Sequence, residues 1–187
     1  MQLKVLSYPD IEQVRLWRNE TLAMNRTPFL LTREQQERFY HDVICNKLNN
    51  SRYWGVWEAQ DKTLPYDWNP DENPEHELRN AFIAMVGIEN IQWENRIGEI
   101  GLLMNPEYVH MAKEAIDLIL CQAFNYLNLE NVYGECYICS PYIEIWQEIA
   151  VKYNAVCCRL PGRKYWEGKY WNSFYFTIDK GEYLRLK

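Results

Sequence analysis

One stretch of the chain, residues 110–129 (HMAKEAIDLILCQAFNYLNL), carries the clearest periodic pattern and constrains the fold most. Small and aliphatic residues recur in it every three or four positions, which places them on one face of a helix. Strand-like apolar runs flank it on both sides. A helix with one apolar stripe between strands packs on a sheet, so the pattern predicts an α/β domain. The stripe comprises Ala112, Ile116, Ile119, Ala123 and Leu127.

The other segments complete the order of elements. Asp10 is the expected N-cap of a helix over 11–24, and Thr32 with Gln35 forms a capping box at the start of a helix over 33–45. Residues 1–187 are thus predicted to form one domain, a mixed, mostly antiparallel seven-stranded sheet flanked by about four helices. Residues 60–80, polar with three prolines, are read as an inserted loop between strands. The expected strands are 3–8, 52–59, 81–92, 96–104, 131–139, 154–160 and 168–178, with a further helix at 141–153.

Composition and charge narrow the class of protein. The 187 residues are 48% hydrophobic and 15% aromatic, enough for a sizeable core, and the net charge of −6 disfavours a nucleic-acid partner. Neither a signal peptide nor an apolar run of about 20 residues is visible, which predicts a cytoplasmic protein without a membrane partner. The oligomeric state, monomer or homodimer, stays open.

The six cysteines are expected to be thiols, because disulfides are rare in the cytosol. Cys136 and Cys139 have CxxC spacing, but in a predicted strand residues three apart point to opposite faces, which is awkward for shared metal ligation. The three histidines are scattered. No metal site is expected.

Four stretches resemble one family when taken in order. They are VRLWRN (14–19), GIENIQWENRIGEIGLLMNPE (87–107), EAIDLILCQAFNYLNLENVYGECY (114–137) and GKYWNSFYFTI (168–178). Together with the order of elements, they resemble the GNAT (GCN5-related) N-acetyltransferases. The likeness is to the branch of ribosomal-protein N-terminal and nucleotide-aminosugar acetyltransferases.

The resemblance implies acetyl-CoA as acetyl donor. Two strands of this fold part, so that pantetheine pairs with exposed backbone like an added strand. The candidate strands contain GEIGLLM and YGECYIC, where Gly98 and Gly101 would ease a bulge or a close ligand approach. The cofactor phosphates would lie at the following helix start, where free N–H groups favour anions. The implied cofactor-binding residues are Leu102, Leu103, Met104, Tyr108, Val109, His110, Met111, Ala112 and Lys113.

The phosphate-binding turn departs from the family pattern, which is arginine or glutamine, two residues, glycine, one residue, then glycine or alanine. The chain offers Glu107, His110 and Ala112 at these positions, and only Ala112 conforms. A positive φ at His110 would cost about 1–2 kcal/mol relative to glycine. A protonated His110 and Lys113 would supply positive charge instead.

Transfer to an amine requires a neutral nucleophile, and an alkylamine with a pKa near 10.4 needs roughly 4–5 kcal/mol to lose its proton at pH 7. Glu99 is the candidate base, on the strand expected to carry the thioester; a cross-strand charge pair is the alternative. Backbone near 101–103 would supply oxyanion donors. Tyr142 is the candidate acid, with a packing role as the alternative.

The resemblance also implies that Arg18 and Asn19 face the acceptor; a solvated helix face is the alternative. Trp93, like Trp54, Trp57 and Trp68, would line an acceptor platform or belong to the core. The sequence therefore predicts an N-acetyltransferase that acts on a primary amine of an aminosugar nucleotide, protein or peptide. The alternatives are a catalytically silent GNAT-fold module with an altered turn and an acyltransferase with another donor.

Overall fold

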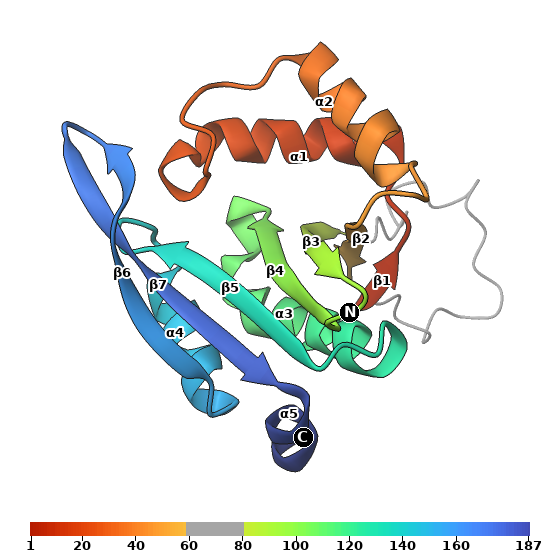
Figure 1. Ribbon diagram of the computed structural model, residues 1–187. Coiled ribbons are helices and arrows are strands. Elements are labelled where there is room, and N and C mark those ends of the chain that lie inside the picture. Colours follow the sequence, from red (N-terminus) through yellow and green to blue (C-terminus); the bar gives the residue numbers. More distant parts are fainter. Residues whose placement is uncertain (59–80) are drawn as a thin grey trace, which may run out of the picture.

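The computed structural model describes residues 1–58 and 81–187, so the predicted insertion at 60–80 and Trp68 lie outside the described residues. Its centre is a seven-stranded sheet with the order β1-β2-β3-β4-β5-β7-β6 (Figure 1). All neighbouring strands are antiparallel except β4 and β5, which are parallel. The strands are β1 (Gln2–Lys4), β2 (Arg52–Trp57), β3 (Phe82–Gln92), β4 (Ile97–Met104), β5 (Asn131–Tyr137), β6 (Val156–Trp166) and β7 (Lys169–Asp179).

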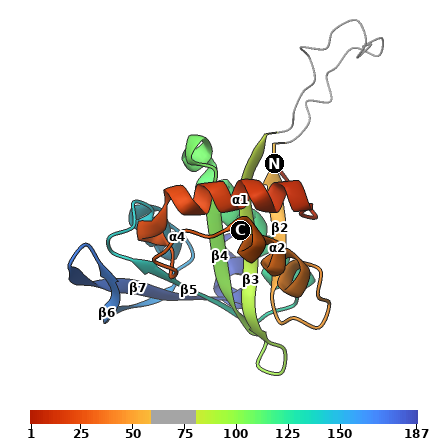
Figure 2. The same cartoon turned by 90° about the horizontal axis from the view of Figure 1, so that it is seen from above.

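Helices cover both faces of the sheet. Two of them, α1 and α2, lie on one face, and α1 crosses over β3 and β4 (Figure 2). The others lie on the opposite face, where α3 covers the centre of the sheet. The helices are α1 (Tyr8–Glu20), α2 (Arg33–Phe39), α3 (Ala112–Cys121), α4 (Ile143–Lys152) and α5 (Lys180–Leu186). The predicted mixed, mostly antiparallel seven-stranded sheet flanked by helices is confirmed, with α5 as an unpredicted addition.

The start of α1 differs from the prediction. Ser7, not Asp10, is the N-cap, and the Ser7 backbone N–H donates to the Asp10 carboxylate at 2.7 Å. Asp10 thus closes a capping box from inside the first turn, and Pro9 fits there because its missing N–H is not needed. The helix also ends early, at Glu20, where the Asn25 side chain donates to the Arg18 carbonyl at 2.8 Å. Residues Leu22–Met24 form a separate short 3-10 turn.

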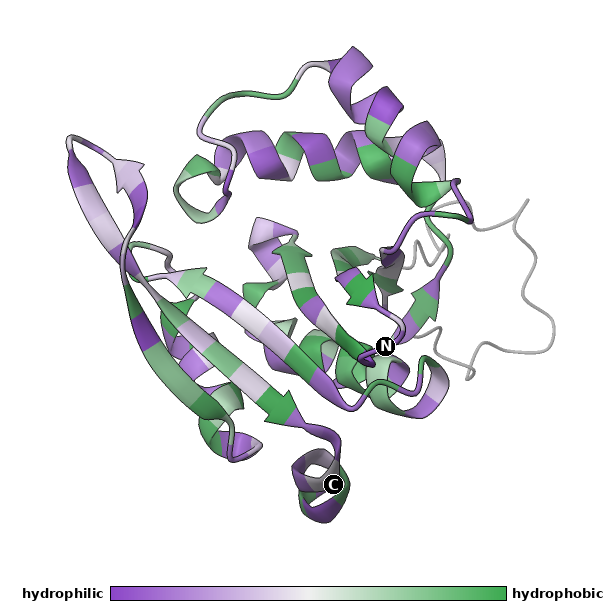
Figure 3. Cartoon of the chain, viewed as in Figure 1, coloured by the Kyte–Doolittle hydropathy of each residue, from purple (hydrophilic) through white to green (hydrophobic). Residues whose placement is uncertain are grey.

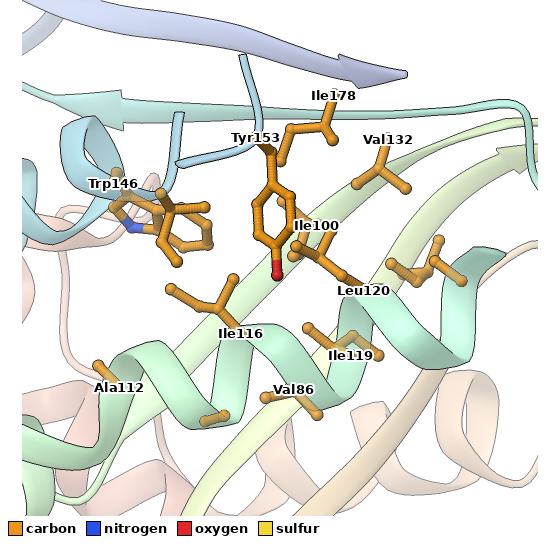
Figure 4. Close-up of a cluster of buried hydrophobic side chains, with 14 of the residues drawn as sticks. Val86, Ile100, Ala112, Ile116, Ile119, Leu120, Val132, Trp146, Tyr153 and Ile178 are labelled. Carbon is orange, nitrogen blue, oxygen red and sulfur yellow. The ribbon is translucent and has the colours of Figure 1, made fainter. Parts of the chain in front are cut away.

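The predicted apolar stripe of α3 builds the core. Ala112, Ile116, Ile119 and Ala123 are at most 1% exposed, whereas Leu127, the last residue of the predicted stripe, lies beyond the end of α3 and is only half-buried. Figure 4 shows the α3 side chains directed at residues of β4, β5 and β7, with Tyr153 in the middle of the cluster and Trp146 beside it. Along β5 hydrophobic residues alternate with more hydrophilic ones (Figure 3), as expected of a strand with one face in the core, whereas residues 102–104 at the end of β4 are all hydrophobic.

One cysteine lies outside the strand predicted for it. Strand β5 ends at Tyr137, so Cys139 lies in the turn beyond it and the opposite-face argument does not apply to that residue. All six cysteines are free thiols. Within the described residues, no helix has the length and apolar character needed to cross a membrane.

Candidate active site

The sheet opens between β4 and β5. These strands pair only at Ile97↔Asn131, Gly98↔Val132 and Glu99↔Tyr133. Beyond Glu99, β4 continues to pair with β3 as far as Met104, and β5 pairs with β7 as far as Tyr137. Residues 100–104 therefore pair with a strand on one edge only, and β4 and β5 diverge (Figure 1). This opening lies between the two strands that the sequence pointed to.

A cavity of about 300 Å³ lies at this opening. Its walls come from both faces of the sheet. Arg18 of α1 and Arg26 of the following loop approach from one face, while Tyr142 and Trp146 at α4 approach from the other. The cavity therefore connects the α1 side with the α3–α4 side through the parted strands. The strands contribute three carboxylates to the lining, those of Glu89, Glu99 and Glu135, together with Gly101.

Glu99, the candidate base, is 7% exposed and lines this cavity. Its carboxylate forms an ion pair with Arg26 and accepts a hydrogen bond from the Asn90 side chain at 3.2 Å. Asn90 reaches it because β3 has an irregularity between Glu89 and Gln92, where Asn90 has a φ of 50°. The ion pair with Arg26 and the bond from Asn90 mean that the carboxylate is already engaged.

A second carboxylate, Glu89, was not predicted. It lies opposite Glu99 in the β3–β4 register and lines the same cavity. A Cβ placed on Gly101 would lie 2.7 Å from Glu89 Oε1, so glycine leaves room for this carboxylate over the open edge of β4. Within the described residues Glu89 has no ion-pair partner within 4 Å, in contrast to Glu99. The hairpin turn at 93–95 is centred on Glu94, so positions 89 and 99 are equally far from it along the chain. This spacing in the sequence could have predicted that Glu89 and Glu99 lie opposite each other.

The polar side chains near Glu89 come from α1 and β2. Arg18 lines the cavity, donates to the Thr27 hydroxyl at 3.0 Å, and has its pKa lowered by burial, although a guanidinium keeps its charge. Burial, together with the nearby Glu89 carboxylate, raises the pKa of Tyr53. Asn19 instead exchanges two hydrogen bonds with the Leu31 backbone, at 2.8 and 3.0 Å, and does not line the cavity.

Tyr142, the candidate acid, reaches the cavity from the N-terminus of α4. It is 7% exposed, and burial raises its pKa, so its hydroxyl keeps its proton at neutral pH. Its backbone N–H donates to Ser140 Oγ at 3.2 Å, which fixes the start of the helix. The Cys136 thiol lines the same cavity, and burial raises its pKa to about 11, so it is uncharged there.

The residues expected to hold the cofactor follow one another in space. Leu102, Leu103 and Met104 lie on the segment of β4 whose second edge is open, and the chain then forms a 3-10 turn over Pro106–Met111 that leads into α3. Contrary to expectation, this turn needs no left-handed residue. The non-glycine residues with positive φ lie elsewhere, so the predicted strain at His110 is wrong.

Some polar groups of this turn are already bonded within the protein, while others are accessible to an anion. The N–H groups of Tyr108 and Ala112 donate to carbonyls of the turn itself, and Lys113 pairs with Glu148 of α4. His110, by contrast, is exposed with its ring beside that of Tyr108, at 6.2 Å between centroids, and it does not plug the cavity. An open β4 edge that leads to an exposed helix start fits a long cofactor that pairs with backbone along its middle.

The remaining candidate residues do not line the cavity. Trp93 donates to Asn50 at 3.2 Å and lies 5.7 Å from the Arg52 guanidinium, outside the cavity lining. Trp57 stacks on Phe82 with 4.8 Å between ring centroids. Gly98 makes room for Ile88 and Leu129 of the core. The β3–β4 ladder is regular at Gly101, whereas Gly98 lies opposite the irregularity between Glu89 and Gln92. Across 1–58 and 81–187, no three His, Cys, Asp or Glu side chains come together as a metal site.

Comparison with known proteins agrees with this architecture. The chain superposes on the spermidine/spermine N-acetyltransferase SpeG of Vibrio cholerae, in mutant form, with a TM-score of 0.75 at 18% identity, covering 98% of this chain and 96% of the other. The spermidine N-acetyltransferase of the same organism in complex with CoA and spermine gives 0.74 at 19% identity, covering 98% and 97%. No curated protein matches in sequence. The sequence model of the acetyltransferase (GNAT) domain family matches residues 2–138, and the chain therefore belongs to the GNAT acetyltransferase family.

Proposed function

We propose that this acetyl-CoA-dependent N-acetyltransferase carries out transfer in the cavity between β4 and β5, with the acceptor amine entering from the α1 side. The open edge of β4 beside that cavity is the observation that carries the proposal. Acetyl-CoA supplies the reactive thioester when bound. Leu102, Leu103 and Met104 would hold its middle by backbone pairing, and residues 108–113 would meet its phosphates.

The acceptor side needs a group that attracts an ammonium ion and then takes its proton. Glu89 and Glu99 both face the cavity, but Glu99 is engaged by Arg26 and Asn90. We assign proton removal to Glu89, which has no ion pair among the described residues, and we assign to Glu99 the positioning of Arg26. Glu99 as the base remains the alternative.

Tyr142 is the proposed donor of the proton that the departing thiolate needs. Tyr142 lines the cavity together with Trp146, and burial raises its pKa above the ordinary value near 10. A group that is protonated at neutral pH and borders the opening is suited to this task.

The class of amine is the finer part of the proposal. The V. cholerae relatives are spermidine acetyltransferases, one of them solved with spermine, whereas the sequence motifs resemble the ribosomal-protein and aminosugar branch. We propose a primary amine of a small molecule or peptide. The six free thiols support a cytoplasmic location, where disulfides are rare. A monomer or a homodimer is compatible with this site.

Thermal unfolding with acetyl-CoA tests the cofactor part. Ligand at a hundred times its dissociation constant stabilises a protein by about 2.7 kcal/mol, which for this chain length raises the melting temperature by roughly 5–10 °C. Free-thiol release on addition of primary amines then measures turnover. An unchanged melting temperature at millimolar acetyl-CoA, together with no thiol release, would favour the silent module instead.

A further inference from the structure

A second cavity of about 460 Å³ adjoins the first on the α1 face of the sheet, over β5, β6 and β7. The two cavities share Arg26, Glu99, Glu135 and Tyr137 in their walls, so they meet at the Arg26–Glu99 ion pair. A molecule whose amine lies in the first cavity can therefore extend past Arg26 into the second. The proposed acetyl transfer takes place in the first cavity and gives the second cavity no function.

The charges of the second cavity are paired, but the two signs are not equally accessible. The Glu99 and Glu135 side chains are 9% and 10% exposed, whereas the arginines paired with them, Arg26 and Arg163, are 54% and 51% exposed. The carboxylates thus lie behind the guanidiniums. A ligand that enters the cavity meets positive charge first.

Arg163 keeps donors for a ligand. It uses Nε and Nη2 on the Glu135 carboxylate, at 2.9 and 3.3 Å. Its third nitrogen, Nη1, donates to no residue that the structure describes. A guanidinium has five N–H donors in a planar fork, so Arg163 can hold Glu135 and a second oxyanion together. Ser173 also donates to Glu135 at 2.6 Å, which keeps this carboxylate directed inward.

The remaining wall is aromatic. Tyr133 and Tyr175 stack with 5.8 Å between ring centroids and an interplanar angle of 27°. Tyr133 is opposite Glu99 in the register, at the point where β4 and β5 part. The wall therefore leads from the opening towards Arg163.

We propose that this second cavity binds an anionic group, a carboxylate or a phosphate, which the amine acceptor carries beyond its reacting nitrogen. The inference rests on the proposed amine acetylation and specifies its substrate as a zwitterion rather than a polyamine. A second ammonium ion would be repelled by the exposed guanidiniums of Arg26 and Arg163, while an anion is attracted by both.

A matched series of acceptors tests this inference in the full-length protein. Butylamine, 4-aminobutyrate, 3-aminopropyl phosphate and 1,4-diaminobutane present the same primary amine with a neutral, carboxylate, phosphate or cationic end. We expect kcat/KM for at least one anionic acceptor to exceed that for the diamine by about tenfold or more, the effect of one charge-assisted hydrogen bond. The better of the two anions identifies the group.

Substitutions in the Arg163–Glu135 pair then act in opposite directions. Arg163→Gln should reduce the preference for the anionic acceptor about tenfold, and Glu135→Gln, which releases Arg163, should increase it. Arg159→Gln is the matched control, because Arg159 is exposed on the same strand and lines neither cavity. A diamine preferred by the unmodified enzyme, or equal preferences in the Arg163 and Arg159 variants, would overturn the inference. Failure of the amine acetylation itself would differ, since none of the four amines would then react.

Discussion

At the scale of single residues, the two facing carboxylates of β3 and β4 differ in their surroundings, although they lie opposite each other. Glu99 is paired with Arg26, while Glu89 lies over Gly101 without an ion pair among the described residues. Glu89→Gln should therefore lower kcat about 100-fold or more, the usual range for loss of a general base, with a smaller effect for Glu99→Gln. Rates of thiol release from the two isosteric variants make the comparison. A larger loss for Glu99→Gln would return the base role to Glu99.

Tyr142 gives a second residue-scale prediction. Tyr142→Phe keeps the ring and removes the hydroxyl, so we expect kcat to fall by about 100-fold while the acceptor KM changes little. Tyr126→Phe is the control, since Tyr126 is 73% exposed on the surface. The raised pKa of Tyr142 keeps its acid form present through neutral pH, so its ionisation should limit the rate only above about pH 10. Equal rates for the two phenylalanine variants would identify Tyr142 as a packing residue.

The sequence was sufficient to predict part of this site. Position in the resembling fold predicts Glu99, Tyr142 and Arg18, and all three border one cavity. Arg26 comes from an irregular loop, where no periodic pattern indicates direction. Asn19 looked equivalent to Arg18, its neighbour, but successive residues of a helix face different ways, and Asn19 contacts Leu31 instead.

At the scale of elements, the loop after α1 is attached to the β6–β7 hairpin by one buried cation. Lys164 is 6% exposed, and its ammonium donates to the carbonyls of Leu22 and Asn25. Asn25 precedes Arg26, so Lys164→Met should free the loop and raise the acceptor KM several-fold, with kcat less affected. Lys169→Met, on an exposed lysine of the same hairpin, is the control. An acceptor KM equal to that of the control would show that the loop holds its place without this contact.

The pairing of β5 with β7 yields a stability prediction. Gly134 is opposite Phe176, and a Cβ at Gly134 would overlap the Phe176 ring. Gly134→Ala should therefore reduce the free energy of unfolding by about 1–3 kcal/mol, the common cost of overpacking. Urea denaturation measures it. Phe176→Leu in the same chain should restore part of that loss, and simple additivity of the two changes would contradict direct contact.

Helices and strands could be predicted from the sequence because their apolar residues follow different patterns. The predicted helical stripe lies buried along α3, and the apolar runs of β3 and β4 supply buried residues of the core. Boundaries depended on capping, where Ser7 and Asp10 compete for the same role and only geometry decides. The helix α5 follows β7 without a loop and holds only seven residues, too few for a visible period.

At the scale of the whole molecule, buried tyrosines make stability sensitive to alkali. Burial raises the pKa of six of them in the folded state, while the unfolded chain ionises its tyrosines near pH 10. The unfolded state then binds fewer protons than the folded state, so stability falls as pH rises above about 10. The tyrosines are Tyr53, Tyr133, Tyr137, Tyr142, Tyr153 and Tyr183.

Urea midpoints at pH 8, 9, 10 and 11 measure this dependence. Absorbance of phenolate at alkaline pH should rise together with the loss of structure rather than before it. A urea midpoint that stays constant to pH 11 would contradict the assignment of these side chains as buried proton-holding groups.

The parting of β4 and β5 has a mechanical consequence for the sheet. Strands β4 and β5 pair over three residues at one end of their junction, and beyond Glu99 and Tyr133 neither strand has a partner on the facing edge. Amide hydrogens of residues 100–104 that point to this open edge should therefore exchange with solvent faster than those of β3 beside them. Backbone pairing of acetyl-CoA along this edge would slow their exchange without any change of fold, so that binding the donor and extending the sheet become one event.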